Sequence, residues 1–505
     1  LFAALTRLQL ETADAEQYDW WYCTEFSSDT LPDRHAISLY CESLATLADI
    51  WLNGQLIARS ANMFIPVLAD IAPHVQQHNQ LAICFRSVHH FLLQRRPRPR
   101  WKTALVNHQQ LRWLRTSLMG RIPAWTTTTP ALGPVGRVGL QVWKTWRMLE
   151  AQVTTRLSGS DGHINVRIET TSNVDNAWLE FGTLRIPLDG EAQHQTTTFS
   201  GSACIEHPAL WWPHTHGSPE LYPVRLIVSV AGKQYDVDLG KRGFSARRLD
   251  LDSHPATMSL NGVSIFCRGA CWTITDLQNI YSDREDLYRS LQLAKSAGLN
   301  MIRITGIARY EQTEFYELCD ELGIMVWQDF MFANMDYPLD DPAFLDSVRT
   351  EIRTQLTRLR QHSCITVYCG NSEVQQQAAM QGLDQQYWSH SFFDAELPAL
   401  CEEFHPGIPY IVSTPSGGAL PFHLATGTAH FYGVGNYRRT LASSGADKVR
   451  FASESLGFSN VPEPSRIEQL FGGHTPACHD PTWKQGVPRD AGAGHDFEDV
   501  RDHYL

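Results

Sequence analysis

The sequence predicts a multidomain protein of the β plus α/β class, in which two β-sandwiches precede a (β/α)8 barrel. Its length of 505 residues is about three times that of a usual domain. Short apolar runs separated by turn residues fill the first half of the chain. After Gly262, short apolar strands alternate with amphipathic helices, which is the pattern of parallel βαβ units.

The β-rich half contains one clear hairpin signal, Asn53-Gly54 between two apolar runs. This dipeptide accepts the positive φ angles that a two-residue type I′ turn requires. Further short apolar runs lie at residues 80–85, 166–168, 177–181, 224–230 and 235–239. We therefore predict one β-sandwich over residues 1–148 and a second over residues 149–248.

The remaining residues, 249–505, are predicted to form the barrel. Its helices are a first one with a capping box from Ser282 to Glu285, a second over residues 313–322, and a third that opens at Asp341-Pro342. Seven strands are predicted at residues 265–269, 301–304, 324–327, 366–369, 410–413, 426–430 and 451–453. An eighth strand is not found, so we expect a barrel that lacks its last strand because the chain is truncated at its C-terminus.

Composition narrows the class of partner. Lys and Arg number 42 against 54 for Asp and Glu, and the resulting net charge of −12 argues against a nucleic-acid protein. One basic stretch, Arg95 to Lys102, is interpreted as a solvated, proline-stiffened loop, with contact to a phosphate or sugar acid as the alternative.

Cysteine usage and hydropathy bear on location. The 11 cysteines include no CxxC pair, which favours reduced thiols in a reducing compartment. No apolar run approaches the roughly 18–20 residues that a membrane span needs. We expect a cytoplasmic protein without membrane contact, although the start at Leu1 indicates an incomplete N-terminus.

Polar residues at the strand ends mark the expected site, because active sites of such barrels lie at the C-terminal ends of the strands. These candidates are Arg303, Gln328, Asp329, Asn371, Glu373, His430 and Glu454. Glycoside hydrolysis needs two carboxylates, about 5–5.5 Å apart when configuration is retained. The fourth and seventh strands lie across the barrel mouth from each other, so Glu373 and Glu454 could form that pair, with Asn371 bonded to a ring hydroxyl.

Five motifs resemble the β-mannosidase branch of glycoside hydrolase family 2. They are Asp320–Phe332, Tyr368–Glu373, Arg450–Glu454, Leu210–Pro213 and Asp49–Gly54. The resemblance implies a jelly-roll first domain, an immunoglobulin-like second domain and a TIM barrel. It implies a retaining exo-β-glycosidase, most simply a β-mannosidase, with a carbohydrate substrate and neither cofactor nor metal.

Within that resemblance Glu454 would be the nucleophile and Glu373 the acid/base. Arg303, His430, Trp327 and Asp329 would contact the substrate or line the site. Several of these residues also have an interpretation without catalysis. Glu373 could cap a helix, and the charge of Glu454 could interact favourably with the dipole at a helix N-terminus. Asn371 could satisfy a turn, and Arg303 could pair with a buried acid.

Three departures from the family pattern leave the sugar open. The segment from Pro123 to Pro130 lacks the acidic residue of the family's loop, Thr305-Gly306 loses an aromatic wall, and Ser455 to Gly457 is one residue longer than usual. The alternatives are therefore a glucosaminide, galactoside or glucuronide substrate, or a carbohydrate-binding protein without turnover. The oligomeric state stays open, a homodimer included.

Overall fold

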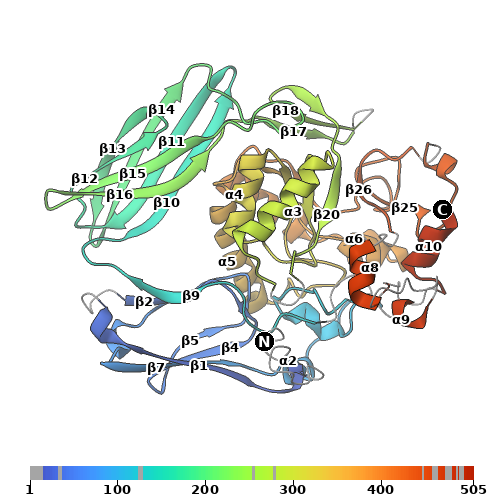
Figure 1. Ribbon diagram of the computed structural model, residues 1–505, viewed down its shortest axis with the longest axis horizontal. Coiled ribbons are helices and arrows are strands. Elements are labelled where there is room, and N and C mark those ends of the chain that lie inside the picture. Colours follow the sequence, from blue (N-terminus) through green and yellow to red (C-terminus); the bar gives the residue numbers. More distant parts are fainter. Residues whose placement is uncertain are drawn as a thin grey trace.

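The computed structural model describes residues 15–31, 37–122, 129–252, 256–276, 280–445, 448–457, 464–471, 480–484, 487 and 494–505. Residues 123–128, part of the segment from Pro123 to Pro130 that differs from the family pattern, lie outside these ranges. Figure 1 shows three regions: a β-sandwich at the N-terminus in blue, a second one in green, and an α/β region beside both. The short helices near the C-terminus lie at the far side of the α/β region.

The N-terminal sandwich is built from two main antiparallel sheets. One has the order β1 (Trp20–Ser27), β7 (His78–Phe85), β4 (Ala48–Leu52), β5 (Gln55–Ser60), and the other β6 (Val67–Asp70), β2 (Ile37–Cys41), β9 (Val138–Val142). A short pair, β3 (Leu44–Ala45) and β8 (Gly133–Pro134), lies beside them, and the five-residue helix α2 (Val88–Leu92) follows β7. Apolar residues from both sheets share one core. The predicted turn is confirmed, with φ of 52° at Asn53 and 79° at Gly54.

The second sandwich is one continuous ladder folded into two layers. Its order is β10 (Met148–Ser158), β11 (Asp161–Thr171), β14 (Thr196–Ile205), β13 (Leu184–Gln193), β12 (Asn176–Phe181), β15 (Tyr222–Val230), β16 (Lys233–Arg242). The first half of β13 pairs with β12 and its second half with β14. A strand shared in this way passes from one layer to the other, and the inward side chains of both layers form the core.

A small antiparallel sheet leads into the α/β region: β17 (Arg247–Asp250), β18 (Thr257–Leu260) and β19 (Val263–Ile265). Five parallel strands follow in sequence order: β20 (Gly269–Trp272), β21 (Met301–Ile304), β22 (Met325–Asp329), β23 (Ile365–Cys369) and β24 (Tyr410–Ile411). A separate parallel pair consists of β25 (Ala429–Gly435) and β26 (Ala452–Leu456). Every residue of β21, β22 and β23 is buried, which explains their continuous apolar sequence.

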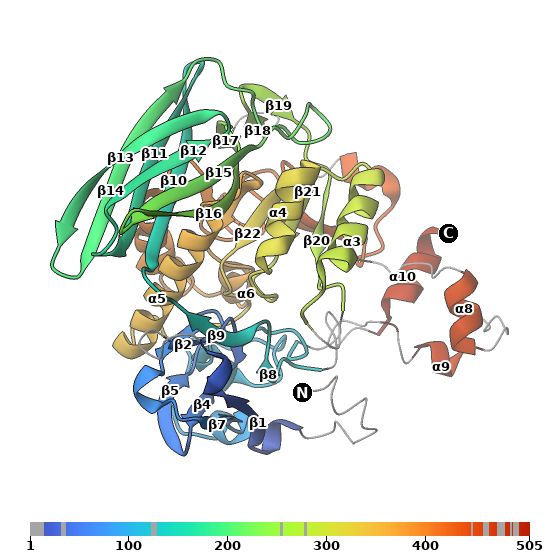
Figure 2. The ribbon, with the colours of Figure 1, turned by 60° about the vertical axis from the view of Figure 1, so that its left-hand side comes forward.

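The helices of this region are α3 (Arg284–Ser296), α4 (Thr313–Leu322), α5 (Pro342–Leu359), α6 (Val374–Met380) and α7 (Leu397–Phe404). After β26 come α8 (Pro464–Phe471), α9 (Pro481–Lys484) and α10 (Phe497–Tyr504). In Figure 2, α3 and α4 run alongside β20, β21 and β22. None of the helices in the described part of the chain is long and apolar enough to cross a membrane.

Two of the predicted helix boundaries agree with the structure. Helix α4 ends at Gly323, whose φ of 68° is the left-handed conformation that glycine adopts most easily. Helix α5 begins after Asp341, whose side chain accepts a hydrogen bond from the backbone N–H of Phe344 at 2.9 Å. Both signals are local, so the sequence suffices to place them.

Three predicted boundaries are wrong. The predicted strand over residues 265–269 is two segments, because the Asn261-Gly262 turn pairs β19 back onto β18 and the first parallel strand starts only at Gly269. The sixth strand spans 429–435 rather than 426–430. Asp283, not Ser282, caps α3, since its carboxylate accepts a hydrogen bond from the N–H of Asp286 at 2.8 Å.

Seven parallel strands lie in the described part of residues 249–505, and none of the described residues after Leu456 forms another. The two parallel sheets approach each other where the Cys271 thiol lies 3.8 Å from the carbonyl oxygen of Ser453. The ten cysteines that the structure describes are all free thiols.

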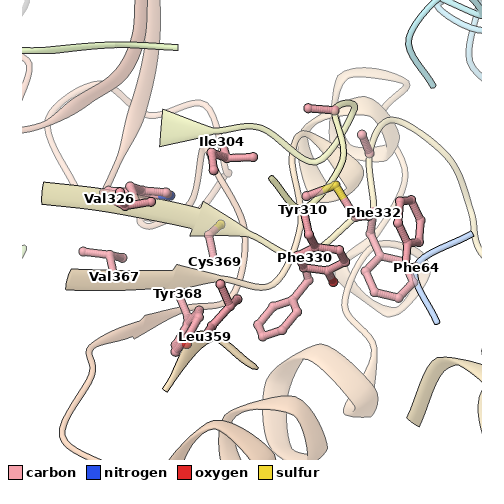
Figure 3. Close-up of a cluster of buried hydrophobic side chains, with 14 of the residues drawn as sticks. Phe64, Ile304, Tyr310, Val326, Phe330, Phe332, Leu359, Val367, Tyr368 and Cys369 are labelled. Atoms are coloured by element: carbon pink, nitrogen blue, oxygen red, sulfur yellow. The ribbon is translucent and has the colours of Figure 1, made fainter. Parts of the chain in front are cut away.

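A buried ion pair joins the first domain to the α/β region. The guanidinium of Arg115 lies 2.6 Å from the carboxylate of Glu351 on α5, and the two side chains are 2% and 0% exposed. Asn62 and Tyr310 donate to the same carboxylate at 3.0 and 3.1 Å. Aromatic packing surrounds the pair, with Phe64 of the first domain close to Tyr310 and Phe332 (Figure 3). This interface holds part of the first domain beside the carboxyl ends of the parallel strands.

Candidate active site

A cavity of about 640 Å³ opens at the C-terminal ends of the parallel strands. Its polar lining includes Arg303, Ser372, Glu373 and Glu454. Apolar walls come from both regions, and include Trp272, Ile307, Trp327, Phe451, and the first-domain residues Leu105 and Ile122. A volume of this size holds a ligand larger than one sugar ring.

Glu454 lies on β26 with both carboxylate oxygens engaged. Oε1 accepts a hydrogen bond from Nη1 of Arg303 at 2.8 Å, and Oε2 accepts one from the hydroxyl of Tyr432 at 2.6 Å. Burial favours the neutral form of Glu454, but the charges of His430 and Arg303 and these two hydrogen bonds outweigh it, so the pKa lies below its ordinary value. The carboxylate is therefore held ionised and oriented.

Arg303 is held in place by the buried carboxylate of Asp329. Its guanidinium donates to Asp329 at 2.7 Å, and Asp329 also accepts hydrogen bonds from the Trp327 indole at 2.9 Å and the N–H of Gly306 at 3.1 Å. Burial raises the pKa of Asp329 despite the opposing charge of Arg303. Trp327 stacks on Phe451 with ring centroids 5.4 Å apart, so it forms part of the cavity floor.

Glu373 occupies an unusual backbone position at the start of α6. Its φ of 61° and ψ of 5° are left-handed values, which are uncommon for a residue with a Cβ and occur most often where a site constrains the chain. The N–H of Glu373 donates to the carbonyl of Thr414 at 2.7 Å. Oε1 faces Nδ1 of His430 at 2.7 Å, and Oε2 accepts a hydrogen bond from Nε2 of Gln377 at 3.0 Å.

His430 lies between the two carboxylates. Its Nδ1 is 2.7 Å from Glu373 and 3.4 Å from Glu454. Because Nδ1 lies 3.4 Å from the carboxylate of Glu454, which is held ionised, we infer that this nitrogen carries a proton. Nε2 lies 2.7 Å from the hydroxyl of Thr414. One potential metal-ligand atom from each of Glu373, His430 and Glu454 lies within 4.8 Å of the others.

The close approach of Glu373, His430 and Glu454 is compatible with two functions, cation binding and glycoside hydrolysis. Two carboxylates and an imidazole can hold a cation, but both oxygens of Glu454 already accept hydrogen bonds from Arg303 and Tyr432. An oxygen of Glu373 and one of Glu454 lie within 4.8 Å of each other, so the two carboxyl groups are near enough for the retaining arrangement, in which they are roughly 5–5.5 Å apart. The two glutamates have different surroundings, with a cation beside Glu454 and an amide beside Glu373, which suits a division of roles.

The predicted residues divide into two groups. Glu373, Glu454, Arg303 and Trp327 line the cavity, and His430 contacts both glutamates. Asp329 and Asn371 are fully buried and are not among the lining residues. Asn371 donates to the carbonyl of Val412 at 3.0 Å and accepts from the hydroxyl of Ser413 at 2.6 Å and from the N–H of Val374 at 3.2 Å. It thereby holds the loop that carries Glu373.

Two contacts of the glutamates were missed in the sequence. Tyr432 follows His430 by two positions on β25, and period-two alternation along a strand could have placed both on one face. Gln377 follows Glu373 by four positions, which is one turn of helix α6. The contacts of Thr414 carried no comparable signal, because they depend on how β24 and β25 approach each other.

Two of the three departures from the family pattern lie at the cavity. Ser455, Leu456 and Gly457 line it. Thr305 lines the cavity, and Gly306 has no room for a side chain, since an added Cβ would lie 2.3 Å from the carbonyl oxygen of Phe332. In the basic stretch, Arg100 pairs with Asp336 at 2.7 Å. None of residues 95–102 lines the cavity.

Comparisons with known proteins agree with this architecture. Residues 3–136 match the family model "Glycosyl hydrolase 2 galactose-binding domain-like", and residues 146–244 match "Glycosyl hydrolases family 2". Beta-mannosidase B of Emericella nidulans is 30% identical over 521 residues, which is 92% of this chain and 58% of that protein. Beta-mannosidase B of Thermothelomyces thermophilus is 29% identical over 454 residues, or 82% of this chain and 52% of that protein.

Among solved structures, the beta-D-mannosidase of Dictyoglomus thermophilum aligns with a TM-score of 0.82 at 27% identity, and covers 92% of this chain and 60% of that one. This chain therefore spans only about half to three fifths of the length of these relatives. Two family models over the sandwiches, and mannosidase relatives that extend across the site, support a β-mannosidase-like protein of glycoside hydrolase family 2.

Proposed function

We propose that this protein is a retaining exo-β-glycosidase that hydrolyses terminal non-reducing β-linked sugars, with β-mannosides as its preferred substrates. The observation that carries the proposal is the approach of Glu373 and Glu454, whose oxygens lie within 4.8 Å of each other in different surroundings. The likeness to named β-mannosidases supports the choice of sugar.

In the first step, the carboxylate of Glu454 attacks the anomeric carbon while the protonated carboxyl of Glu373 gives its proton to the leaving oxygen. The ionised state that Arg303 and Tyr432 favour at Glu454 is the state that a nucleophile needs. A covalent glycosyl-enzyme results, and the alcohol leaves.

In the second step, Glu373 acts as a base and removes a proton from water, which attacks the anomeric carbon and releases Glu454. Both steps retain configuration at that carbon. In our proposal Arg303 and Trp327 border the bound sugar, and His430 holds Glu373 ready for both proton transfers. Asp329 acts through Arg303. Asn371 has the place of a loop anchor in this scheme rather than of a sugar contact, because it is fully buried and does not line the cavity.

The chain is proposed to consist of a jelly-roll domain over residues 1–148, an immunoglobulin-like domain over 149–248 and the catalytic domain over 249–505. We interpret the seven parallel strands as part of a TIM barrel. The proposed partner is a carbohydrate and not a nucleic acid, in keeping with the net charge of −12.

Among the rival sugars, a glucuronide is the least favoured. Arg303 is the one Lys or Arg among the described residues that line the cavity, and its guanidinium already binds Glu454 and Asp329. Among the described residues that line the cavity, a sugar carboxylate would meet no second lysine or arginine. A glucosaminide differs from a mannoside at one ring carbon and a galactoside at two, and both stay as alternatives.

A panel of p-nitrophenyl β-glycosides tests the proposal. The mannoside should be hydrolysed with the highest kcat/KM, and a 2-deoxy-2-fluoro mannoside with a good leaving group should label Glu454, detected by peptide mass spectrometry. Sugar binding without hydrolysis of any glycoside would instead support a carbohydrate-binding protein. Labelling of another residue would refute the assigned roles.

A further inference from the structure

The first domain contacts the helix that carries Glu373 at two successive turns. The hydroxyl of Thr103 donates to Oε1 of Gln377 at 3.3 Å, and the carbonyl of Lys102 accepts a hydrogen bond from Nε2 of Gln381 at 2.6 Å. Thr103 is only 7% exposed, and its own carbonyl accepts a hydrogen bond from Gln109 at 2.6 Å. The segment is therefore held firmly against α6.

The Thr103 hydroxyl and the Glu373 carboxylate together favour one orientation of the Gln377 amide. The Thr103 hydroxyl accepts a hydrogen bond from the N–H of Leu105 at 3.1 Å and donates its single proton to the oxygen of Gln377 at 3.3 Å. With its oxygen turned to Thr103, Gln377 directs its nitrogen at Oε2 of Glu373, 3.0 Å away. The opposite orientation would bring the amide oxygen against the carboxylate.

Gln377 is also a hydrogen-bond donor that Glu373 does not share with Glu454. The other donor, Nδ1 of His430, lies 2.7 Å from Glu373 but only 3.4 Å from Glu454, so it can turn toward either carboxylate. The protonated carboxyl group of Glu373 needs a fixed direction to give its proton to a leaving oxygen. A displacement of this group by about 0.5 Å is enough to weaken such a site.

We propose that Gln377 is a positioning residue for Glu373 and that Thr103, from the first domain, sets the orientation of the Gln377 amide. The inference rests on the proposed function, since it assigns Glu373 the role of acid/base. It gives the first domain a part in the proton transfer, through two hydrogen bonds rather than through contact with the sugar.

The test compares four variants of this protein on two aryl mannosides, one with a poor leaving group and one with a dinitrophenyl group. Gln377→Met and Thr103→Val should each lower kcat/KM on the poor leaving group by about tenfold or more, the effect of one hydrogen bond to a charged group, and should leave the dinitrophenyl substrate within about twofold. Thr103→Ser should restore activity. Gln381→Met removes the neighbouring interdomain hydrogen bond and should change neither rate.

Equal losses on both substrates, or a Thr103→Val variant with full activity on the poor leaving group, would overturn the inference. If the unmodified protein hydrolyses no glycoside, the proposed function fails by itself. Crystal structures then decide the positioning question: Glu373 should keep its contact with Gln377 in the unmodified protein and lose it in Thr103→Val. An unchanged Glu373 in that variant would refute the positioning role.

Discussion

Replacing Glu373 by alanine tests the acid/base role most directly. The substitution removes the proton donor but leaves the nucleophile and its partners Arg303 and Tyr432 in place. General acid catalysis contributes about 10²–10⁴ in rate, which corresponds to roughly 2.7–5.5 kcal/mol of transition-state stabilisation at about 1.36 kcal/mol per decade. We expect a loss of that size on a mannoside with a poor leaving group, and a small loss on one whose leaving group departs without a proton.

The structure also predicts rescue by a small anion. Without the Glu373 carboxylate, Nδ1 of His430 and Nε2 of Gln377 lose the acceptor that lay 2.7 and 3.0 Å from them. Azide can enter that space, accept the same hydrogen bonds, and attack the glycosyl-enzyme without help from a base. The product would be a β-glycosyl azide.

The assay is kcat/KM on a series of aryl β-mannosides of graded leaving-group acidity, with and without sodium azide, with mass spectrometry of the product. Glu403→Ala, which removes an exposed glutamate of α7, is the matched control and should behave as the unmodified protein. A loss that is uniform across leaving groups, without azide rescue, would show that Glu373 is not the acid/base.

Three further predictions concern the nucleophile and the domain interface. Glu454→Gln should abolish hydrolysis and retain sugar binding in calorimetry; residual turnover above contamination would exclude Glu454 as nucleophile. Tyr432→Phe should move the acid limb of the kcat/KM profile to higher pH, because the lost hydrogen bond favoured the ionised carboxylate; an unmoved limb, or one moved to lower pH, would contradict this. Arg115→Met should destabilise the protein by about 3–5 kcal/mol, since it leaves Glu351 buried without its cation, whereas Arg115→Met with Glu351→Met should recover much of that loss in urea unfolding; equal midpoints for single and double variants would count against the pair.

Much of the architecture could be predicted because its causes are local. The Asn53-Gly54 turn, the end of α4 at Gly323 and the start of α5 after Asp341 each depend on the conformational preferences of a few adjacent residues. Six of the seven predicted parallel strands overlap a parallel strand of the structure by two or more residues. The three fully buried ones, β21, β22 and β23, follow from apolar runs that such strands need. The placement of the first parallel strand was wrong because the second strand of a hairpin, β19, precedes it by only a few residues.

The candidate site shows the same division. Residue types and strand ends sufficed to select Glu373, Glu454, Arg303 and His430, because active sites of α/β folds gather where parallel strands end, whereas Trp327 was selected through the family resemblance. What an isolated residue does there depends on its neighbours. Asn371 is fully buried with three hydrogen bonds to its own loop region, and nothing in the sequence distinguished that environment from an exposed one.

By itself, then, the sequence determined the order of β and α/β regions and the residue types available for chemistry, because both follow from local propensity and spacing. The tertiary structure alone decided that Glu373 and Glu454 meet through His430, that Tyr432 binds the second glutamate, and that Thr103 reaches Gln377. These contacts join segments far apart in the chain, and their geometry follows from the packing of strands and domains, which no local pattern records.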